Sequence, residues 1–211
     1  MGFITQIRKY SSTLHSASEH TGYIKRITDK KASKESYGEY LYNLLPMYKA
    51  IEDALDKNSN NEVVKEFVTK ELYRSKLIEK DIKYLLGDKS SSITLLSSTK
   101  ASIARIEEIS NTKPELIVAY AYTRFLADLF GGRTFFELFN KEYNIPHEGL
   151  KYYMFENIED IRMYAMKYAA KLNTINLPEE CKDEFITEVN NAYIYNLAIS
   201  NELETKLYMN K

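Results

Sequence analysis

The stretch PELIVAYAYTRFLADLFGG, residues 114–132, predicts a long buried helix that runs into two adjacent glycines. Pro114 stands at the first turn, where proline costs no hydrogen bond. The apolar residues that follow recur three and four apart, which places them on one helix face. A glycine inside a helix costs about 1 kcal/mol relative to alanine. Gly131 and Gly132 therefore indicate a kink, a close approach of the backbone to another body, or a helix end.

The same helical spacing extends along the chain in both directions. Bends are expected at Gly22 and at Pro46, which lacks an N–H donor. Ser33 suits a helix N-cap, and Gly87 suits a helix C-terminus. Further helices are predicted over residues 4–28, 33–57, 62–86, 93–110, 158–174 and 178–207, with residues 144–157 as an irregular connection. With six to eight helices and no convincing strand, the chain is predicted to be a single all-α domain over residues 1–211.

The composition argues against several classes of protein. Seven Gly and four Pro are too few for the turns of a β-sandwich or barrel. A total of 29 Lys and Arg against 30 Asp and Glu gives a net charge of −1, which argues against a dedicated nucleic-acid binder. The single cysteine, Cys181, excludes a disulfide framework. No apolar run approaches the length of a membrane span and no signal peptide is visible, so we expect a cytoplasmic protein without a membrane anchor.

Two groups of side chains indicate chemistry. Asp128 lies three and four residues before the paired glycines, so it shares their helix face and can hold a polar ligand or water there. Arg124, four residues earlier, offers an ordinary ion pair as the alternative. His15 is followed four residues later by Glu19, and a carboxylate that accepts one ring N–H leaves the other nitrogen available to a metal. A surface histidine with a chance acidic neighbour is the alternative interpretation.

The motifs of several well-known catalytic and metal sites are missing from the chain. The sequence contains no P-loop, no G-x-S-x-G, no C-x-x-C and no H-E-x-x-H. It also lacks the paired E-x-x-H motif of ferritin-like di-iron proteins. His20 and His147 have no evident partner of the kind that His15 has.

The residues around both groups resemble the haem oxygenase family. The run AYTRFLADLFGG, residues 121–132, is similar to the family's distal-helix signature A-Y-T-R-Y-L-G-D-L-S-G-G, and LHSASEH, residues 14–20, is similar to its proximal motif. Similarity continues along nearly the whole chain, at YLYNLLPMYKAIEDAL, ELYRSKLIEKDIKYLLG, FENIEDIRMYAMKYAAKLN and NNAYIYNLAISNELE. The resemblance implies a multi-helix fold in which haem is held between a proximal helix and a kinked distal helix.

Matched position by position, the resemblance implies roles for five polar residues. His15 corresponds to the axial ligand of the haem iron, and Glu19 corresponds to its hydrogen-bonding partner. Asp128 corresponds to the distal carboxylate that organises water near bound dioxygen. Arg124 and Tyr48 match positions that extend this polar network, so the resemblance gives all three distal residues a part in catalysis.

The paired glycines also match the family. Gly131 and Gly132 correspond to the kink that lets the backbone lie against the haem face. Ala127 departs from the pattern, because the family usually has glycine there. Its methyl group could crowd a ligand on the iron.

At the haem edge, Arg8 and Tyr122 match positions near the propionates. The propionate-binding Lys and Arg that the family carries near its C-terminus fall on Ala165 and Ala169 of this chain. The cations that would have to replace them are Arg162, Lys167 or Lys171.

The resemblance implies an enzyme that opens the haem macrocycle to biliverdin, free iron and carbon monoxide. Haem is then both cofactor and substrate, and the reaction uses O₂ and electrons from a ferredoxin, a flavodoxin or a flavin reductase. We expect a monomer. A non-catalytic haem-binding carrier or sensor is the alternative, motivated by Ala127 and by the two missing cations. A haem-free relative of thiamin-degrading enzymes is disfavoured, because no recognisable motif supplies its nucleophilic cysteine.

Overall fold

The computed structural model describes residues 2–209, which form helices and connecting turns without a strand. This confirms the predicted all-α class. The eight α-helices are α1 (Phe3–His20), α2 (Gly22–Thr28), α3 (Lys34–Lys57), α4 (Ser75–Leu86), α5 (Ser97–Thr112), α6 (Ile117–Glu142), α7 (Ile161–Lys171) and α8 (Glu179–Glu204). Short 3₁₀ turns connect several of them, and a π-helical turn, Thr205–Met209, follows α8.

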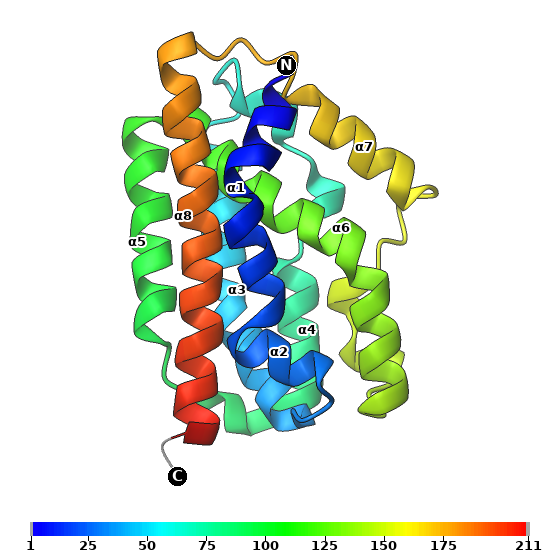
Figure 1. The fold of residues 1–211 in the computed structure, drawn as a ribbon. Coiled ribbons are helices and arrows are strands. Elements are labelled where there is room, and N and C mark those ends of the chain that lie inside the picture. Colours follow the sequence, from blue (N-terminus) through cyan, green and yellow to red (C-terminus); the bar gives the residue numbers. More distant parts are fainter. Residues whose placement is uncertain (1, 210–211) are drawn as a thin grey trace.

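Helix α8 contacts several of the other helices along its length. It packs against α1, α2, α5 and α6, while α3 packs against α4 and α5. Figure 1 shows α5, α8 and α1 side by side, with α6 leading away from them and changing direction along its length. Because α1 and α6 both contact α8, residues from the N-terminal helix and from the middle of the sequence can meet across one space.

Local signals explain where several helices begin and end. Ser33 caps α3: its hydroxyl accepts from the Ser36 backbone N–H at 3.1 Å, and the Ser36 hydroxyl accepts from the Ser33 N–H at 2.9 Å. Helix α3 continues through Pro46 to its end at Lys57. Gly87 has a positive φ of 52° at the end of α4, which glycine adopts without steric cost.

The prediction of one helix over residues 62–86 is wrong for its first half. Only Ser75–Leu86 is α-helical, and two 3₁₀ turns, Val64–Phe67 and Lys70–Leu72, precede it. The buried carboxylate of Glu52 fixes the start of α4 by accepting the backbone N–H groups of Arg74 and Ser75 at 2.6 and 2.9 Å. The apolar residues before that point are buried without a regular helix, so their spacing reflected burial alone.

The break between α1 and α2 depends on Gly22. Its φ is +57°, and a Cβ atom there would lie 2.7 Å from Ser200 Oγ and 2.8 Å from the Asn201 backbone nitrogen. The Ser200 hydroxyl joins the break to α8, since it accepts from the Ile24 N–H at 3.1 Å and donates to the Thr21 carbonyl at 3.2 Å. The positive φ of Gly22 and the close approach of α8 therefore both require glycine at this position.

Replacing Gly22 with alanine should lower the free energy of unfolding by about 2–4 kcal/mol, because backbone strain and overpacking against α8 add together. Gly87→Ala is the control, since φ is positive there too but nothing lies within 4 Å of the added Cβ. Its loss should be about 1–3 kcal/mol, from backbone strain alone. Urea denaturation of both variants measures the difference, and equal losses would contradict the role assigned to the Ser200 contact.

Candidate functional site

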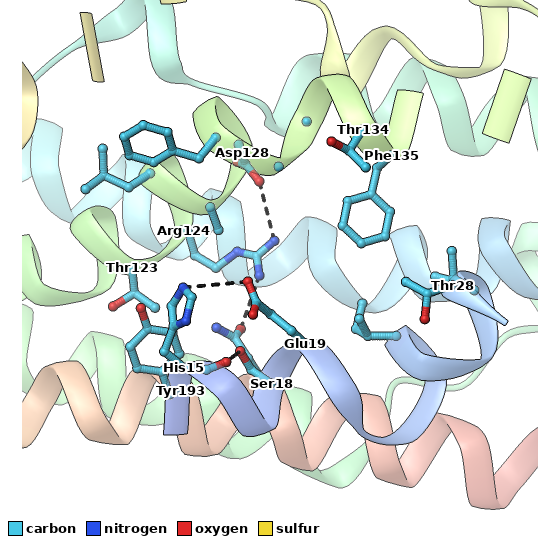
Figure 2. Close-up of a pocket in the computed structure, with 18 of the residues that line it drawn as sticks. His15, Ser18, Glu19, Thr28, Thr123, Arg124, Asp128, Thr134, Phe135 and Tyr193 are labelled. Carbon is cyan, nitrogen blue, oxygen red and sulfur yellow. Dashed lines mark hydrogen bonds and ion pairs between the residues drawn. The ribbon is translucent and has the colours of Figure 1, made fainter. Parts of the chain in front are cut away.

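A cavity of about 800 Å³ lies between α1 and α6. Side chains from both helices line it, and α2, α3, α8 and the 3₁₀ turn η6 (Lys151–Tyr153) contribute the rest of the wall. Figure 2 shows His15 and Glu19 on one side and Arg124 and Asp128 on the other. The predicted site residues that line the cavity are Arg8, His15, Glu19, Tyr122, Arg124, Asp128, Gly131 and Gly132.

The wall formed by α1 presents His15. Its side chain is 54% exposed, its Nε2 lies 3.8 Å from Glu19 Oε1, and its ring stands edge-on to Tyr193 of α8 with the ring centroids 5.6 Å apart. His20 also lines the cavity, but its Nδ1 lies 2.7 Å from the carbonyl oxygen of Ser16 in its own helix. His15 is therefore the cavity histidine that has a carboxylate beside its ring, whereas the ring of His20 has a backbone carbonyl.

The opposite wall is a buried polar network centred on Asp128. Tyr48 of α3 donates to Asp128 Oδ2 at 2.6 Å, and Tyr152 of η6 donates to Asp128 Oδ1 at 2.5 Å. Arg124 donates to the two phenol oxygens at 2.8 and 2.9 Å, and its Nη2 lies 3.7 Å from Asp128 Oδ1. The predicted Arg124–Asp128 ion pair and the predicted distal residues therefore belong to one hydrogen-bonded network. Tyr48 is a member of this network but does not line the cavity.

Tyr152 is a member of this network that sequence reasoning missed. It lies in the segment predicted as an irregular connection, where no helical spacing points to a buried face. Only 2% of the residue is exposed, and its phenol reaches the carboxylate 24 positions away in sequence. No local signal in the sequence identifies it, because the contact depends on how the turn packs.

The charge of the network is set by burial. Burial raises the pKa of the Asp128 carboxyl, while Arg124 and the two phenols act in the opposite direction. Burial also raises the pKa values of Tyr48 and Tyr152 well above that of free tyrosine, so both phenols keep their protons. One buried carboxylate thus faces one guanidinium and two proton donors, an arrangement suited to holding protons and water beside a ligand.

The paired glycines lie within α6, which continues to Glu142, so the alternative of a helix end is wrong. A Cβ on Gly132 would lie 3.5 Å from the ring of Tyr153, whereas one on Gly131 would meet only Phe135, at 3.8 Å. Figure 1 shows α6 bending along its length. Ala127 lines the same cavity and adds the methyl group expected there.

The cations at the cavity edge differ from the prediction. Arg8 lines the cavity, is exposed, and lies close enough to the buried Tyr122 phenol for its charge to oppose the rise in pKa that burial causes there. Neither predicted lysine lines the cavity, because α7 turns Ala165 and Ala169 into the core and carries the lysines on its other side. Lys171 donates instead to the carbonyl of Glu66 at 2.7 Å. Of the residues predicted for the site, those that lie outside the lining are Tyr48, Arg162, Lys167 and Lys171.

Comparison with known proteins identifies the family. A family model described as "Heme oxygenase" matches residues 1–202. The chain belongs to the haem oxygenase family. A heme oxygenase of Guillardia theta is 32% identical over 201 residues, covering 94% of this chain and 85% of that protein. A heme oxygenase of Porphyra purpurea is 32% identical over 204 residues, covering 96% of this chain and 86% of that protein.

Solved haem oxygenases share the fold of the whole chain. Heme oxygenase-1 of the cyanobacterium Synechocystis, crystallised in complex with heme, superimposes with a TM-score of 0.92 at 26% identity and covers 99% of this chain and 95% of its own. The heme oxygenase of Leptospira interrogans gives a TM-score of 0.90 at 28% identity, covering 96% of this chain and all of its own. Among the residues described for this haem oxygenase, no helix has the length and apolar character needed to cross a membrane.

Replacing Arg124 with methionine should lower the free energy of unfolding by about 3–5 kcal/mol, because it leaves the Asp128 carboxylate buried without its counter-charge. Adding Asp128→Asn should recover part of that loss. Arg133→Met is the matched control: Arg133 lies on α6, pairs with Glu137 four residues on, and has an 87% exposed side chain. Its effect should stay within about 0–1 kcal/mol, and an equal effect in urea denaturation would contradict the buried-pair account.

Proposed function

We propose that this haem oxygenase binds haem between α1 and α6 and opens its macrocycle to biliverdin, free iron and carbon monoxide. The observation that carries the proposal is the cavity itself, with an imidazole on one wall and a buried carboxylate beside bare glycine backbone on the other. When bound, haem supplies the oxidative chemistry, with O₂ and electrons from outside. The residues of the chain supply position and protons.

The residues present fit haem. The cavity volume of about 800 Å³ lies in the range of about 300–1,000 Å³ that is typical of pockets for organic ligands. Much of its lining is apolar, including Ile24, Leu126, Phe135 and Leu138, as a hydrophobic macrocycle requires. A histidine is a common protein ligand of haem iron.

His15 is proposed as the axial ligand. Glu19, one helical turn on, would accept the remaining ring N–H and fix the orientation of the imidazole. Tyr193, whose ring stands against the imidazole, limits the positions that the ring can take. The proximal wall thus binds and orients the ligand.

Asp128 is proposed to manage protons on the opposite side. Its two oxygens already accept from Tyr48 and Tyr152, and Arg124 holds both phenols in place. The carboxylate is therefore fixed in position at the cavity wall, where it can hold a water molecule and direct a proton into the cavity. Arg124 and Tyr48 act by keeping this group in place.

Bare backbone at Gly131 and Gly132 is proposed to lie against the macrocycle face, where side chains would hold it away. Arg8 is proposed to pair with a propionate, since a guanidinium recognises a carboxylate well. The Tyr122 phenol, which lies near Arg8 at the cavity wall, would help to orient that cation. Lys167 and Lys171 lie outside the lining and have no part in this arrangement.

Several finer aspects of the function belong to the same proposal. The chain would act as one haem oxygenase domain over residues 1–211, as a monomer in the cytoplasm. A ferredoxin, a flavodoxin or a flavin reductase would deliver the electrons. Adding haemin to the purified protein, followed by ascorbate or a reductase system, tests the function directly, because biliverdin formation is visible by its absorption.

His15→Ala should abolish or weaken the normal haem spectrum, because the imidazole ligand is removed, and added imidazole should partly restore it. His20→Ala is the matched control, since this residue lines the same cavity with a ring nitrogen directed at a backbone carbonyl. Its spectrum should match that of the unmodified protein. An unchanged spectrum in His15→Ala would move the ligand to another residue.

Asp128→Ala should leave haem affinity nearly intact, because the carboxylate does not hold the iron. Biliverdin formation should fall about 10²-fold or more, the usual contribution of a positioned proton-transfer group. Glu137→Ala on the same helix is the control, since Glu137 is exposed and outside the cavity lining. Normal biliverdin yield from Asp128→Ala would show that another group manages protons. Loss of yield in both variants would point to a general effect on α6.

A further inference from the structure

Behind the distal wall, Asp81 of α4 holds the turn that carries Tyr152. The carboxylate is completely buried, its Oδ1 accepts the Lys151 backbone N–H at 2.8 Å, and its Oδ2 accepts the Tyr152 N–H at 2.7 Å. Both carboxylate oxygens are thus committed to two successive N–H groups of η6. Asp81 does not line the cavity and plays no part in the function proposed above.

The same segment is also held close to α4 by packing. A Cβ on Gly149, just before η6, would lie 2.7 Å from the ring of Tyr84 on α4. At the other end of the turn, Arg74 donates to the Met154 carbonyl at 2.8 Å. The backbone of this segment is therefore fixed on both sides of Tyr152, and Asp81 holds the residue itself.

We propose that Asp81 is a positioning residue of the distal network, which holds the Tyr152 phenol on Asp128 by fixing the backbone from which that phenol projects. The reactive carboxylate then depends on a second carboxylate two contacts away, on a different helix. The catalytic importance of Asp81 rests on the proposed function. The coupling of Asp81 to Asp128 through Tyr152 is a property of the ligand-free protein and can be measured without haem.

The physical link is the hydrogen bond from Tyr152 to Asp128. A donor to a carboxylate stabilises its ionised form, so losing this bond raises the pKa of Asp128. In Asp81→Asn, one amide oxygen can still accept an N–H, but the NH₂ group faces the other N–H and one of the two bonds is lost. The turn then no longer holds the phenol in its place.

Burial raises the pKa of Asp81 to about 6, while the two N–H groups and the charge of Lys151 act in the opposite direction. The Tyr37 phenol of α3 lies near enough for the Asp81 charge to raise the pKa of Tyr37, adding to the effect of burial. At pH 7.5 the carboxylate is therefore ionised and accepts both N–H groups. Below pH 6 it takes up a proton, and its hold on the turn weakens.

The test follows the Asp128 carboxyl carbon by NMR in ligand-free protein labelled at aspartate, with its signal assigned by its loss in Asp128→Asn. Tyr152→Phe and Asp81→Asn should each raise the pKa of Asp128 by about 0.5 unit or more, about threefold in its acid dissociation constant. The double variant should show no more than the larger single shift, because both changes remove the same bond.

Matched controls remove a similar bond elsewhere. Tyr120 of α6 donates to the buried Glu188 of α8 at 3.0 Å, and neither residue lines the cavity. Tyr120→Phe and Glu188→Gln should lower stability without moving the Asp128 signal. A shift in Tyr152→Phe without one in Asp81→Asn would overturn the positioning role, and no shift in either would overturn the whole coupling.

If Asp81→Asn does not fold, the unmodified protein decides the question. The amide nitrogen signals of Lys151 and Tyr152 should change near pH 6 as Asp81 titrates, and the Asp128 carboxyl signal should change with them. An Asp128 carboxyl signal that does not change as Asp81 titrates would overturn the inference. Because no haem is present, a failure of biliverdin formation would count against the proposed function and leave this result standing.

Discussion

The central constraint on this structure is an arginine and an aspartate one helical turn apart on α6, both almost without access to water. Burying such a pair costs several kcal/mol per ion unless other groups complete its hydrogen bonds. Here α3 brings Tyr48, η6 brings Tyr152, and Asn196 of α8 lies 3.5 Å from the guanidinium. Residues of α3, η6 and α8 must therefore all pack around α6 before this pair can be buried without a large energetic cost. The cavity-facing side of this network, with Arg124, Asp128 and Tyr152, is the distal wall of the cavity.

The helices could be predicted well where local chemistry determines them. The Ser33 cap, the Gly87 terminus and the Pro114 first turn all lie where the sequence places them. The failure over residues 62–74 has a tertiary cause, because the carboxylate of Glu52, distant in sequence, decides where α4 begins. Apolar spacing reports burial, and burial alone does not distinguish a helix from a packed turn.

The residues of the site also differ in whether local sequence or tertiary packing places them. His15 with Glu19, and Arg124 with Asp128, are pairs four residues apart, so helical geometry brings each pair together and the sequence reveals both. Tyr152 reaches the site through the packing of an irregular turn, which no periodic signal describes. The lysines of α7 lie outside the lining for a related reason. Spacing indicates that they share a face, and only packing decides which face of α7 is turned inward.

The two walls of the cavity differ in how firmly they are held. Asp128 is fixed by two phenols, whereas the His15 side chain is more than half exposed and touches an exposed glutamate. A ligand that enters the cavity finds Asp128 already held in position, whereas its binding must immobilise the His15 side chain. The loss of conformational entropy on binding is therefore concentrated at the imidazole. Changes that stiffen α1 around His15 would raise affinity, while the same changes on α6 would gain little.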